Sequence, residues 1–180
     1  MSDPYKPLRR RKLESEATFF RPFQGEPVRV KEADPAVQVM TDLRQVRAMT
    51  IGPSATIDSA LDKMIRDGVR LLLVANPRGE VIGVVTAHDI QGDKPVRYLR
   101  ERGGSREDIH VRDVMTLHDQ LDVLPIEAVH QARVGDIVAT LRQMDRQHAL
   151  VTDVDEATGK TAIRGVFSVT QIAKQLGAPG

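Results

Sequence analysis

The chain has 180 residues, 41% hydrophobic and 28% charged, so it can bury the core of one domain or of two small ones. It has no cysteine, which excludes disulfides and thiolate metal sites, and its formal charge of +1 gives no overall reason to expect a nucleic acid or membrane partner. No apolar run reaches membrane-spanning length and no signal-peptide core opens the chain, so we expect a cytoplasmic protein.

Residues 1–36 differ from the rest and predict an N-terminal arm. They hold the basic run 9–12, several prolines and three of the four phenylalanines, Phe19, Phe20 and Phe23, without helix or strand periodicity. The phenylalanines favour docking of the arm on the body or on a second subunit. A basic run this short is usually solvated, so nucleic acid is not the expected partner.

Residues 37–104 predict a first folded unit with its linker. Its order is strand, helix, strand, strand, helix, because short buried runs alternate with turn signals and one amphipathic stretch. The expected elements are a strand over 46–49, a helix through 67 capped by Thr56 or Asp58, strands over 71–75 and 80–85, a helix from 86 and an exposed helix over 94–102.

Residues 105–180 repeat this pattern. The apolar positions of 57–74 and 134–151 coincide without a gap, and each copy continues to a glycine, an apolar pair and a hydroxyl residue, Thr86 or Ser168. The second copy predicts a helix over 134–147, strands over 149–152 and 162–167, and a longer projecting hairpin loop over 153–160. An internal repeat of this size indicates two similar units side by side.

The stretch 83–90 places Thr86 and Asp89 where a buried strand turns into a helix. One interpretation is an ordinary helix cap, in which the hydroxyl and the acid bond the first turn. The other is a ligand site, because the start of a helix favours a phosphate and an ionised carboxylate can accept hydrogen bonds from both hydroxyls of a ribose. The sequence alone leaves both interpretations open.

The chain resembles the tandem CBS domain pair, or Bateman module. The resemblance rests on the Val-Met-Thr openings at 39–41 and 114–116, on the helix-and-hairpin unit, and on the glycine, threonine and aspartate at 83, 86 and 89. It covers residues 37–176 and implies an α/β fold in which two CBS-type repeats (β-α-β-β-α) pack as a pseudo-twofold pair with two clefts between them. It also implies a homodimer through the CBS faces and an adenosine nucleotide as ligand.

The resemblance assigns roles in a first cleft. Asp89 corresponds to the acid that binds ribose, Thr86 to the hydroxyl on the phosphate side and Val84 to an apolar wall, while Thr116 and Leu121 of the other repeat flank the adenine. Arg70 corresponds to a basic position that meets phosphates, which suits a guanidinium, although a surface arginine at a strand start is an equal alternative.

The second cleft departs from the family pattern. Ser168 keeps the hydroxyl, but Gln171 stands where the ribose acid is expected and Gln147 stands at the basic position. A neutral amide lacks the stronger charge-assisted hydrogen bond. We therefore expect only the cleft with Asp89 to bind a nucleotide tightly.

No catalytic pattern accompanies these features. The five histidines show no paired ligand spacing, and phosphate-loop and nucleophile-elbow motifs are missing, so we expect neither a catalytic nor a metal site. The expected function is a regulatory module that binds AMP, ADP or ATP between its repeats, with S-adenosylmethionine ranked behind them, and signals by conformational change to an unknown protein target. It requires no cofactor. The alternative is a ligand-free scaffold that uses the arm and the dimer faces.

Overall fold

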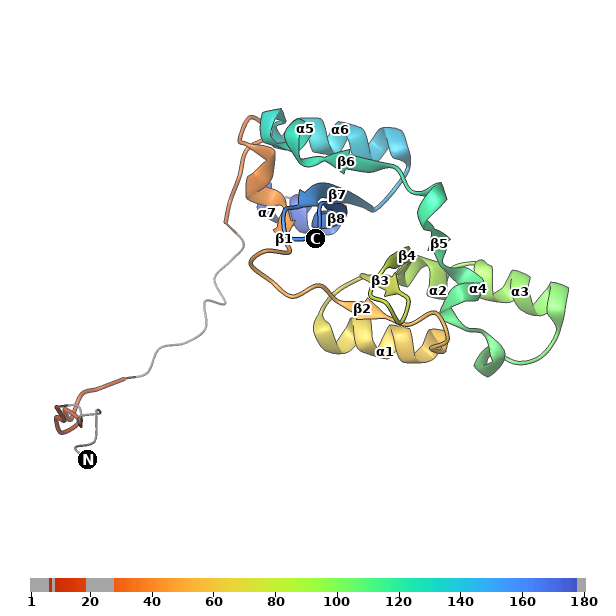
Figure 1. Ribbon diagram of the computed structural model, residues 1–180, viewed down its shortest axis with the longest axis horizontal. Helices are drawn as coiled ribbons and strands as arrows, with labels where there is room; N and C mark the ends of the chain where they lie inside the picture. The colour runs from red at the N-terminus through yellow and green to blue at the C-terminus, as the bar shows by residue number, and fades with distance from the viewer. Residues whose placement is uncertain (1–6, 8, 19–27, 178–180) are drawn as a thin grey trace.

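The structure, a computed structural model, describes residues 7, 9–18 and 28–177 (Figure 1). The docking expected for Phe19, Phe20 and Phe23 lies outside the described residues. Two lobes stand side by side, each with one four-stranded sheet. The strands are β1 (Thr41–Asp42), β2 (Thr50–Ile51), β3 (Leu71–Ala75), β4 (Val81–Thr86), β5 (Thr116–Leu117), β6 (Val123–Pro125), β7 (His148–Asp155) and β8 (Lys160–Ser168).

Helices cover the outer side of both sheets, with α1 on the first lobe and α6 on the second (Figure 1). The α-helices are α1 (Ile57–Asp67), α2 (Ala87–Gln91), α3 (Lys94–Arg102), α4 (Val111–Val114), α5 (Ile126–Gln131), α6 (Val134–Met144) and α7 (Val169–Gln175). The 3₁₀ helices are η1 (Ala36–Val39), η2 (Arg106–Asp108) and η3 (His118–Gln120). Among the described residues, no helix combines the length and the apolar character needed to cross a membrane.

Local sequence explains the boundaries of α1. Thr56 accepts a hydrogen bond from the Ser59 amide at 3.2 Å and so caps the first turn, as the sequence predicts. Gly68 ends the helix in the left-handed conformation, with φ of 67°. Between them, Ile57 and Met64 are buried against the first sheet. The helix therefore begins after Thr56 and ends before Gly68, as the sequence predicts.

Side chains alternate between the two faces of each sheet. In β3, Leu72 and Val74 pack under α1, while Leu73 points the other way and forms a buried cluster with Val84 and Leu150. Leu150 belongs to β7, so the two sheets meet face to face at this cluster. This arrangement confirms the predicted α/β fold of two repeats packed sheet to sheet.

Each repeat lends one short strand to the sheet of the other. The sheets have the orders β2-β3-β4-β5 and β1-β8-β7-β6, so β1 of the first repeat pairs with β8, and β5 of the second repeat pairs with β4. The registers correspond, with Thr41 opposite Val166 and Thr116 opposite Val84. The two Val-Met-Thr openings are therefore the segments that the repeats exchange.

Glycines make this exchange possible. A Cβ added to Gly83 would lie 2.3 Å from the backbone oxygen of Thr116, and one added to Gly165 would lie 2.9 Å from that of Thr41 and 2.6 Å from the sulfur of Met40. All three distances are too short for a Cβ, so only glycine lets the exchanged strand approach. The repeated glycine that marks the motif in the sequence thus serves strand packing.

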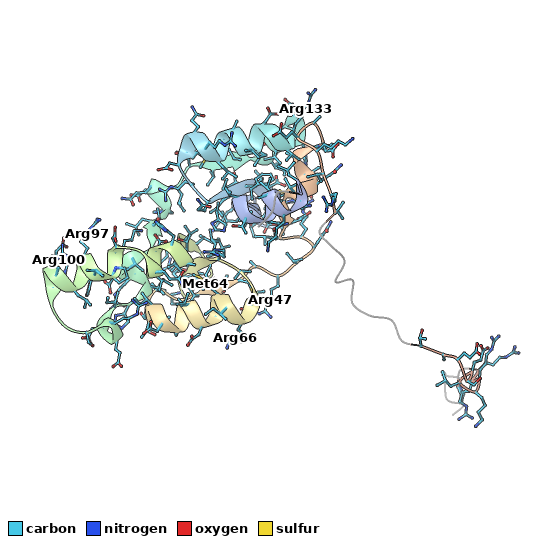
Figure 2. All side chains as sticks on the ribbon, turned by 180° about the vertical axis from the view of Figure 1, so that it is seen from behind. Arg47, Met64, Arg66, Arg97, Arg100 and Arg133 are labelled. Carbon is cyan, nitrogen blue, oxygen red and sulfur yellow. The ribbon has the colours of Figure 1, made fainter. Side chains whose placement is uncertain are left out.

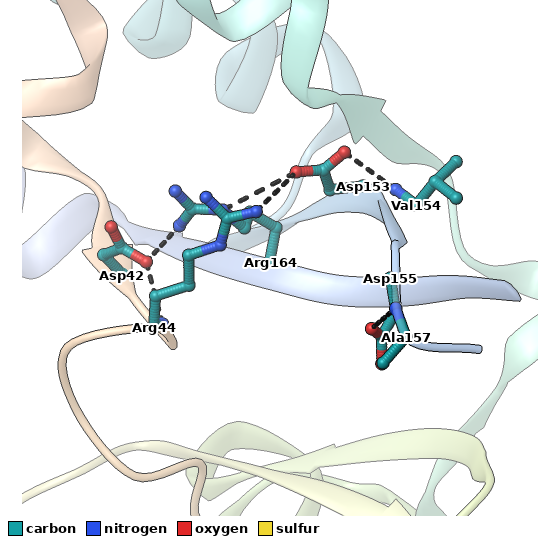
Figure 3. A network of polar contacts seen from close by, with 7 residues as sticks. All are labelled: Asp42, Arg44, Asp153, Val154, Asp155, Ala157 and Arg164. Carbon is teal, nitrogen blue, oxygen red and sulfur yellow. Dashed lines mark hydrogen bonds and ion pairs between the residues drawn. The ribbon is translucent and has the colours of Figure 1, made fainter. Parts of the chain in front are cut away.

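Ion pairs fasten β1 to the second sheet (Figure 3). Arg164 of β8 pairs with Asp42 of β1, and its Nε lies 3.7 Å from Asp153 of β7. Arg44 also approaches Asp153, at 3.7 Å. Because Arg164 and Asp42 are largely shielded from solvent, salt screens this pair less than an exposed one. It connects the first repeat to the core of the second.

Three sequence predictions need correction. Residues 46–49 form no strand, because Asp42 accepts a hydrogen bond from the Arg44 amide and turns the chain, and the strand begins at Thr50. The helix expected over 134–147 ends at Met144, because Asp145 adopts the left-handed conformation. The hairpin loop expected over 153–160 is shorter, because strand pairing continues to Asp155 and Lys160.

The segment before the first repeat contributes to the second lobe. Val30 and Ala36 are buried, together with Val39 of the first repeat, in the same cluster as Ile137 and Phe167. The backbone amide of residue 30 also donates to the carbonyl oxygen of residue 175, at 2.9 Å. The division of the chain at residues 36 and 104 stays a prediction, and the packing shows that the last residues of the arm are part of a core.

Candidate functional site

Two pockets flank the cluster where the sheets meet. The first has a volume of about 420 Å³ and lies on the side of β4 and β5, where residues of β7 and the end of α6 close it. The second has a volume of about 520 Å³ and lies on the side of β2 and β3, where β8 and α7 close it. Both pockets are therefore lined by both repeats, and a ligand in either one would touch both lobes.

Thr86 and Asp89 form a complete capping box at the start of α2. The Thr86 hydroxyl accepts from the Asp89 amide at 3.2 Å, while the Asp89 Oδ2 accepts from the Thr86 amide at 2.9 Å and from its hydroxyl at 3.0 Å. Asp89 is buried, with only 7% of it exposed, and Thr86 is half-buried. The capping interpretation of this motif is thus fulfilled in the folded chain.

Lys94 of α3 neutralises Asp89. Its Nζ lies 2.6 Å from the Asp89 Oδ1 and donates to the carbonyl oxygen of Val114 at 2.9 Å. A carboxylate has about four acceptor positions, and three of those of Asp89 are now filled. No further group among the described residues donates to Oδ1, which leaves one acceptor position there.

Five residues proposed from the sequence meet in the first pocket. Val84, Thr86 and Asp89 come from β4 and α2, and Thr116 and Leu121 come from the second repeat, as the resemblance implies. They are brought together because β5 crosses over to pair with β4. Their roles toward a ligand stay predictions.

Arg70 lies elsewhere than the sequence analysis placed it. It lines the second pocket, together with Ser168 and Gln171, and not the first. The reason is the order of strands: Arg70 precedes β3, which lies next to β2, whereas Thr86 ends β4, which lies next to β5. The equivalent residue of the second repeat, Gln147, lines the first pocket for the same reason.

In the second pocket Ser168 caps α7, accepting from the Gln171 amide at 3.4 Å. The Gln171 side chain accepts from the Thr41 hydroxyl at 3.2 Å and donates to Gln175 at 3.4 Å. Gln171 thus ties the exchanged strand to α7. An acid at this position could still accept from Thr41 but could not donate to Gln175, so the amide suits the network that surrounds it.

His148 lines both pockets, at the first residue of β7. Its Nδ1 is buried and has no hydrogen-bond partner among the described residues. Burial, and then the charge of Arg70, lower the pKa of His148 to about 4. The imidazole is therefore neutral at physiological pH and adds no charge to either pocket.

Sequence reasoning missed several residues of these pockets. In the second they are Arg47, Lys174 and His148, and in the first Arg146 and again His148. Lys174 could have been found, because it follows Gln171 by three residues on one helix and must share its face. The sequence around Arg47 and His148 does not indicate a pocket, because these residues line the pockets only after the two sheets have packed face to face.

Comparisons with known proteins agree with this fold. The family model of the CBS domain matches residues 30–92. An uncharacterized conserved protein from Pyrococcus horikoshii is 23% identical, with a TM-score of 0.57, over 81% of this chain and 93% of that one. CBSX2, solved in complex with AMP, is 21% identical, with a TM-score of 0.54, over 78% of this chain and 94% of that one.

A hexameric CBS-CP12 protein from bloom-forming cyanobacteria is 26% identical, with a TM-score of 0.51, over 75% of this chain and 66% of that one. A search among curated proteins finds no match. The family model thus identifies a CBS domain over residues 30–92, and the fold of the chain is that of solved CBS-domain proteins, consistent with a tandem pair.

Proposed function

We propose that this protein is a non-catalytic regulatory module that binds an adenosine nucleotide, of the AMP, ADP or ATP class, between its two repeats. The observation that carries the proposal is the first pocket, where Thr86 and Asp89 of one repeat face Thr116 and Leu121 of the other. The AMP complex of CBSX2 supports the ligand class by its shared fold. S-adenosylmethionine ranks behind the nucleotides.

The nucleotide would sit with its ribose at Asp89. The open acceptor position on the Asp89 Oδ1 takes one ribose hydroxyl, and the apolar side chains of Val84 and Leu121 suit the adenine. The helix at Thr86 is only five residues long, so we assign the phosphate no partner there. The recognition is therefore mainly of the nucleoside.

The signal would be a change in how the lobes meet. A ligand that touches both repeats shifts their relative arrangement only if it binds one arrangement better than the other. The first pocket satisfies the geometric condition, because its lining comes from β4, β5 and β7. A homodimer through the CBS faces and an unknown protein target complete the proposal, and no cofactor is required.

Calorimetric titration of the nucleotide-free full chain with AMP tests the proposal. Asp89→Asn keeps the shape of the side chain but removes its charge, so we expect AMP to bind about tenfold more weakly, equivalent to about 1.4 kcal/mol. Asp93→Asn is the matched control, because Asp93 is exposed, lies outside the pocket and caps no helix through its side chain. Equal affinities of the two variants would contradict the assignment of Asp89.

A ligand-free scaffold is the second candidate, and a specific observation favours it. Three of the four acceptor positions of Asp89 already bond protein groups, which is what a purely structural cap requires. In that case Asp89→Asn would lower the free energy of unfolding, and calorimetric titration of the unmodified chain with adenosine nucleotides would show no heat of binding. The N-terminal arm and the dimer faces would then carry the function.

A further inference from the structure

Two short segments connect the lobes on opposite sides of the molecule (Figure 1). The first connector, residues 43–49, joins β1 to β2, and the second connector, residues 118–122, joins β5 to β6. The sheet orders β1-β8-β7-β6 and β2-β3-β4-β5 place the first connector at one end of both sheets and the second connector at the other end. Each connector therefore lies on its own edge of the two-lobed body.

The two connectors carry opposite charges at the same spacing. The third and sixth residues after the opening threonine are Arg44 and Arg47 in the first connector, and Asp119 and Asp122 in the second. All four residues are exposed. Only Arg44 has an ion-pair partner among the described residues, Asp153 at 3.7 Å. The charges of the other three are not neutralised within the described part of the chain.

Further cations lie beside the first connector. Arg70, just before β3, and Lys174 of α7 line the same pocket as Arg47, and all three are exposed. No aspartate or glutamate among the described residues lines that pocket. Arg44 stands at the border of this group, because it also approaches Asp153. We call Arg47, Arg70 and Lys174 the basic edge.

The second connector keeps its negative charge. The pocket beside it also contains Asp145 and Arg146, whose opposite charges offset one another, and Asp89, which is buried and already paired. The carboxylates of the connector itself therefore remain unbalanced. We call Asp119 and Asp122 the acidic edge.

Exposed apolar side chains accompany the charges on both edges. Val46 lies in the first connector, and Leu117 and Val123 flank the second; all three are among the large hydrophobic residues that the fold leaves exposed. Both connectors are ordered by local hydrogen bonds, since the Val46 amide donates to the carbonyl oxygen of Asp42 at 3.0 Å and the second connector contains η3. Each edge thus presents charges next to a small apolar surface, which suits a protein contact.

We propose that the basic edge of one copy of this chain binds the acidic edge of a second copy. A second copy fits because each chain carries both halves of the contact, and because the charges follow the same repeated opening in both connectors. Two identical edges would repel each other, so the contact is head-to-tail and can add copies beyond a pair. It goes beyond the proposed function, does not depend on nucleotide binding and leaves the CBS faces free.

Sedimentation velocity of the nucleotide-free full chain at increasing protein concentration tests this contact. At an ionic strength of about 20 mM, charges act over a Debye length of about 20 Å, so we expect the weight-average sedimentation coefficient to rise with concentration. At about 0.5 M salt the charges are screened and the rise should disappear. The species that remains is the one that the CBS faces form by themselves.

Charge reversal tests the two edges separately. One variant carries Arg47→Glu, Arg70→Glu and Lys174→Glu, which makes both edges acidic, and the other carries Asp119→Lys and Asp122→Lys, which makes both edges basic. Each variant alone should self-associate at least about tenfold more weakly than the unmodified chain. A mixture of the two variants should regain the association, and so should one chain that carries all five substitutions, because opposite edges then meet again.

The matched control carries Arg97→Glu, Arg100→Glu and Arg102→Glu. These arginines are exposed on α3, and Arg97 and Arg100 lie at the opposite end of the first lobe from Arg47 (Figure 2). The control changes the net charge as the basic-edge variant does, and it should associate like the unmodified chain. An equal loss in both would overturn the proposal. Circular dichroism melting of each variant checks that the fold is kept.

The remaining outcomes are equally decisive. A sedimentation coefficient that does not rise at low salt overturns the proposal, and so does a rise that survives reversal of either edge, because it then belongs to another surface. A loss that neither the mixture nor the chain with all five substitutions restores overturns the pairing of the two edges. Each of these results leaves the calorimetric test of AMP binding untouched, so the two proposals fail or stand separately.

Discussion

His148 links the two pockets through its position at the start of β7, and it is buried as a neutral imidazole. Unfolding returns its pKa from about 4 to 6.5. Between these values the unfolded chain binds a proton that the folded chain does not. The contribution of His148 to the free energy of unfolding is thus fully present above pH 6.5 and is lost as the pH falls to 4, by about 3 kcal/mol.

Chemical denaturation between pH 7.5 and 4 measures this loss. His148→Gln cannot titrate, so its free energy of unfolding should fall less steeply with decreasing pH than that of the unmodified chain. His130→Gln is the control, because His130 is exposed and lines neither pocket. Identical pH slopes for the His148 variant and the unmodified chain would show that His148 does not drive the effect. The charged groups that share its pockets are Arg47, Arg70, Lys174, Asp89, Asp122, Asp145 and Arg146.

Single residues of the site were predictable only where local sequence determines their place. Thr86 and Asp89 lie three residues apart at a strand-to-helix turn, so their capping box follows from spacing. Arg70 was assigned to the wrong pocket. The pocket that Arg70 lines depends on the order of the strands in the sheet, which the local sequence does not determine. Lys94 was expected only as part of an exposed helix, and its contact with Asp89 depends on how α3 folds back.

At the scale of elements, the exchanged strands need glycine opposite them. Gly83→Ala would place a Cβ 2.3 Å from the Thr116 backbone oxygen. The atoms in conflict belong to the backbone of both strands, so they cannot move apart without a cost in free energy. We expect the free energy of unfolding to fall by about 1 to 3 kcal/mol, measured by urea denaturation. Gly52→Ala is the control, since a Cβ there meets nothing within 4 Å and its change should stay within about 0.5 kcal/mol. Similar losses in both variants would contradict the close-approach argument.

The repeat made most elements predictable, because two copies of one pattern agree on where helices and strands begin. The bounds of α1, β3 and α3 match the expectation, whereas the strand expected over 46–49 was displaced by the turn at Asp42. The exchange of β1 and β5 was not foreseen. Two-residue strands carry almost no periodicity, and their partners lie more than 30 residues away in the chain.

At the scale of the whole molecule, the exchange makes the lobes interdependent. Each sheet contains a strand of the other repeat, the Arg164 ion pairs hold β1 in place, and Leu73, Val84 and Leu150 join the sheets. Neither lobe can complete its core while the other is unfolded. We therefore predict that both lobes lose structure in one cooperative transition.

Hydrogen exchange under increasing denaturant tests whether the two lobes unfold together, because it reports the opening free energies of β3 and of β7 separately in the unmodified chain. The two values should agree without ligand. AMP at 100 times its dissociation constant should raise both by about 2.7 kcal/mol, since a ligand that bridges the repeats is released only when they unfold together. Asp89→Asn at the same AMP concentration should lower that increase in both strands equally. An increase confined to β3 would show that the first pocket holds its ligand through one repeat, and separate opening free energies without ligand would show that the exchanged strands do not couple the lobes.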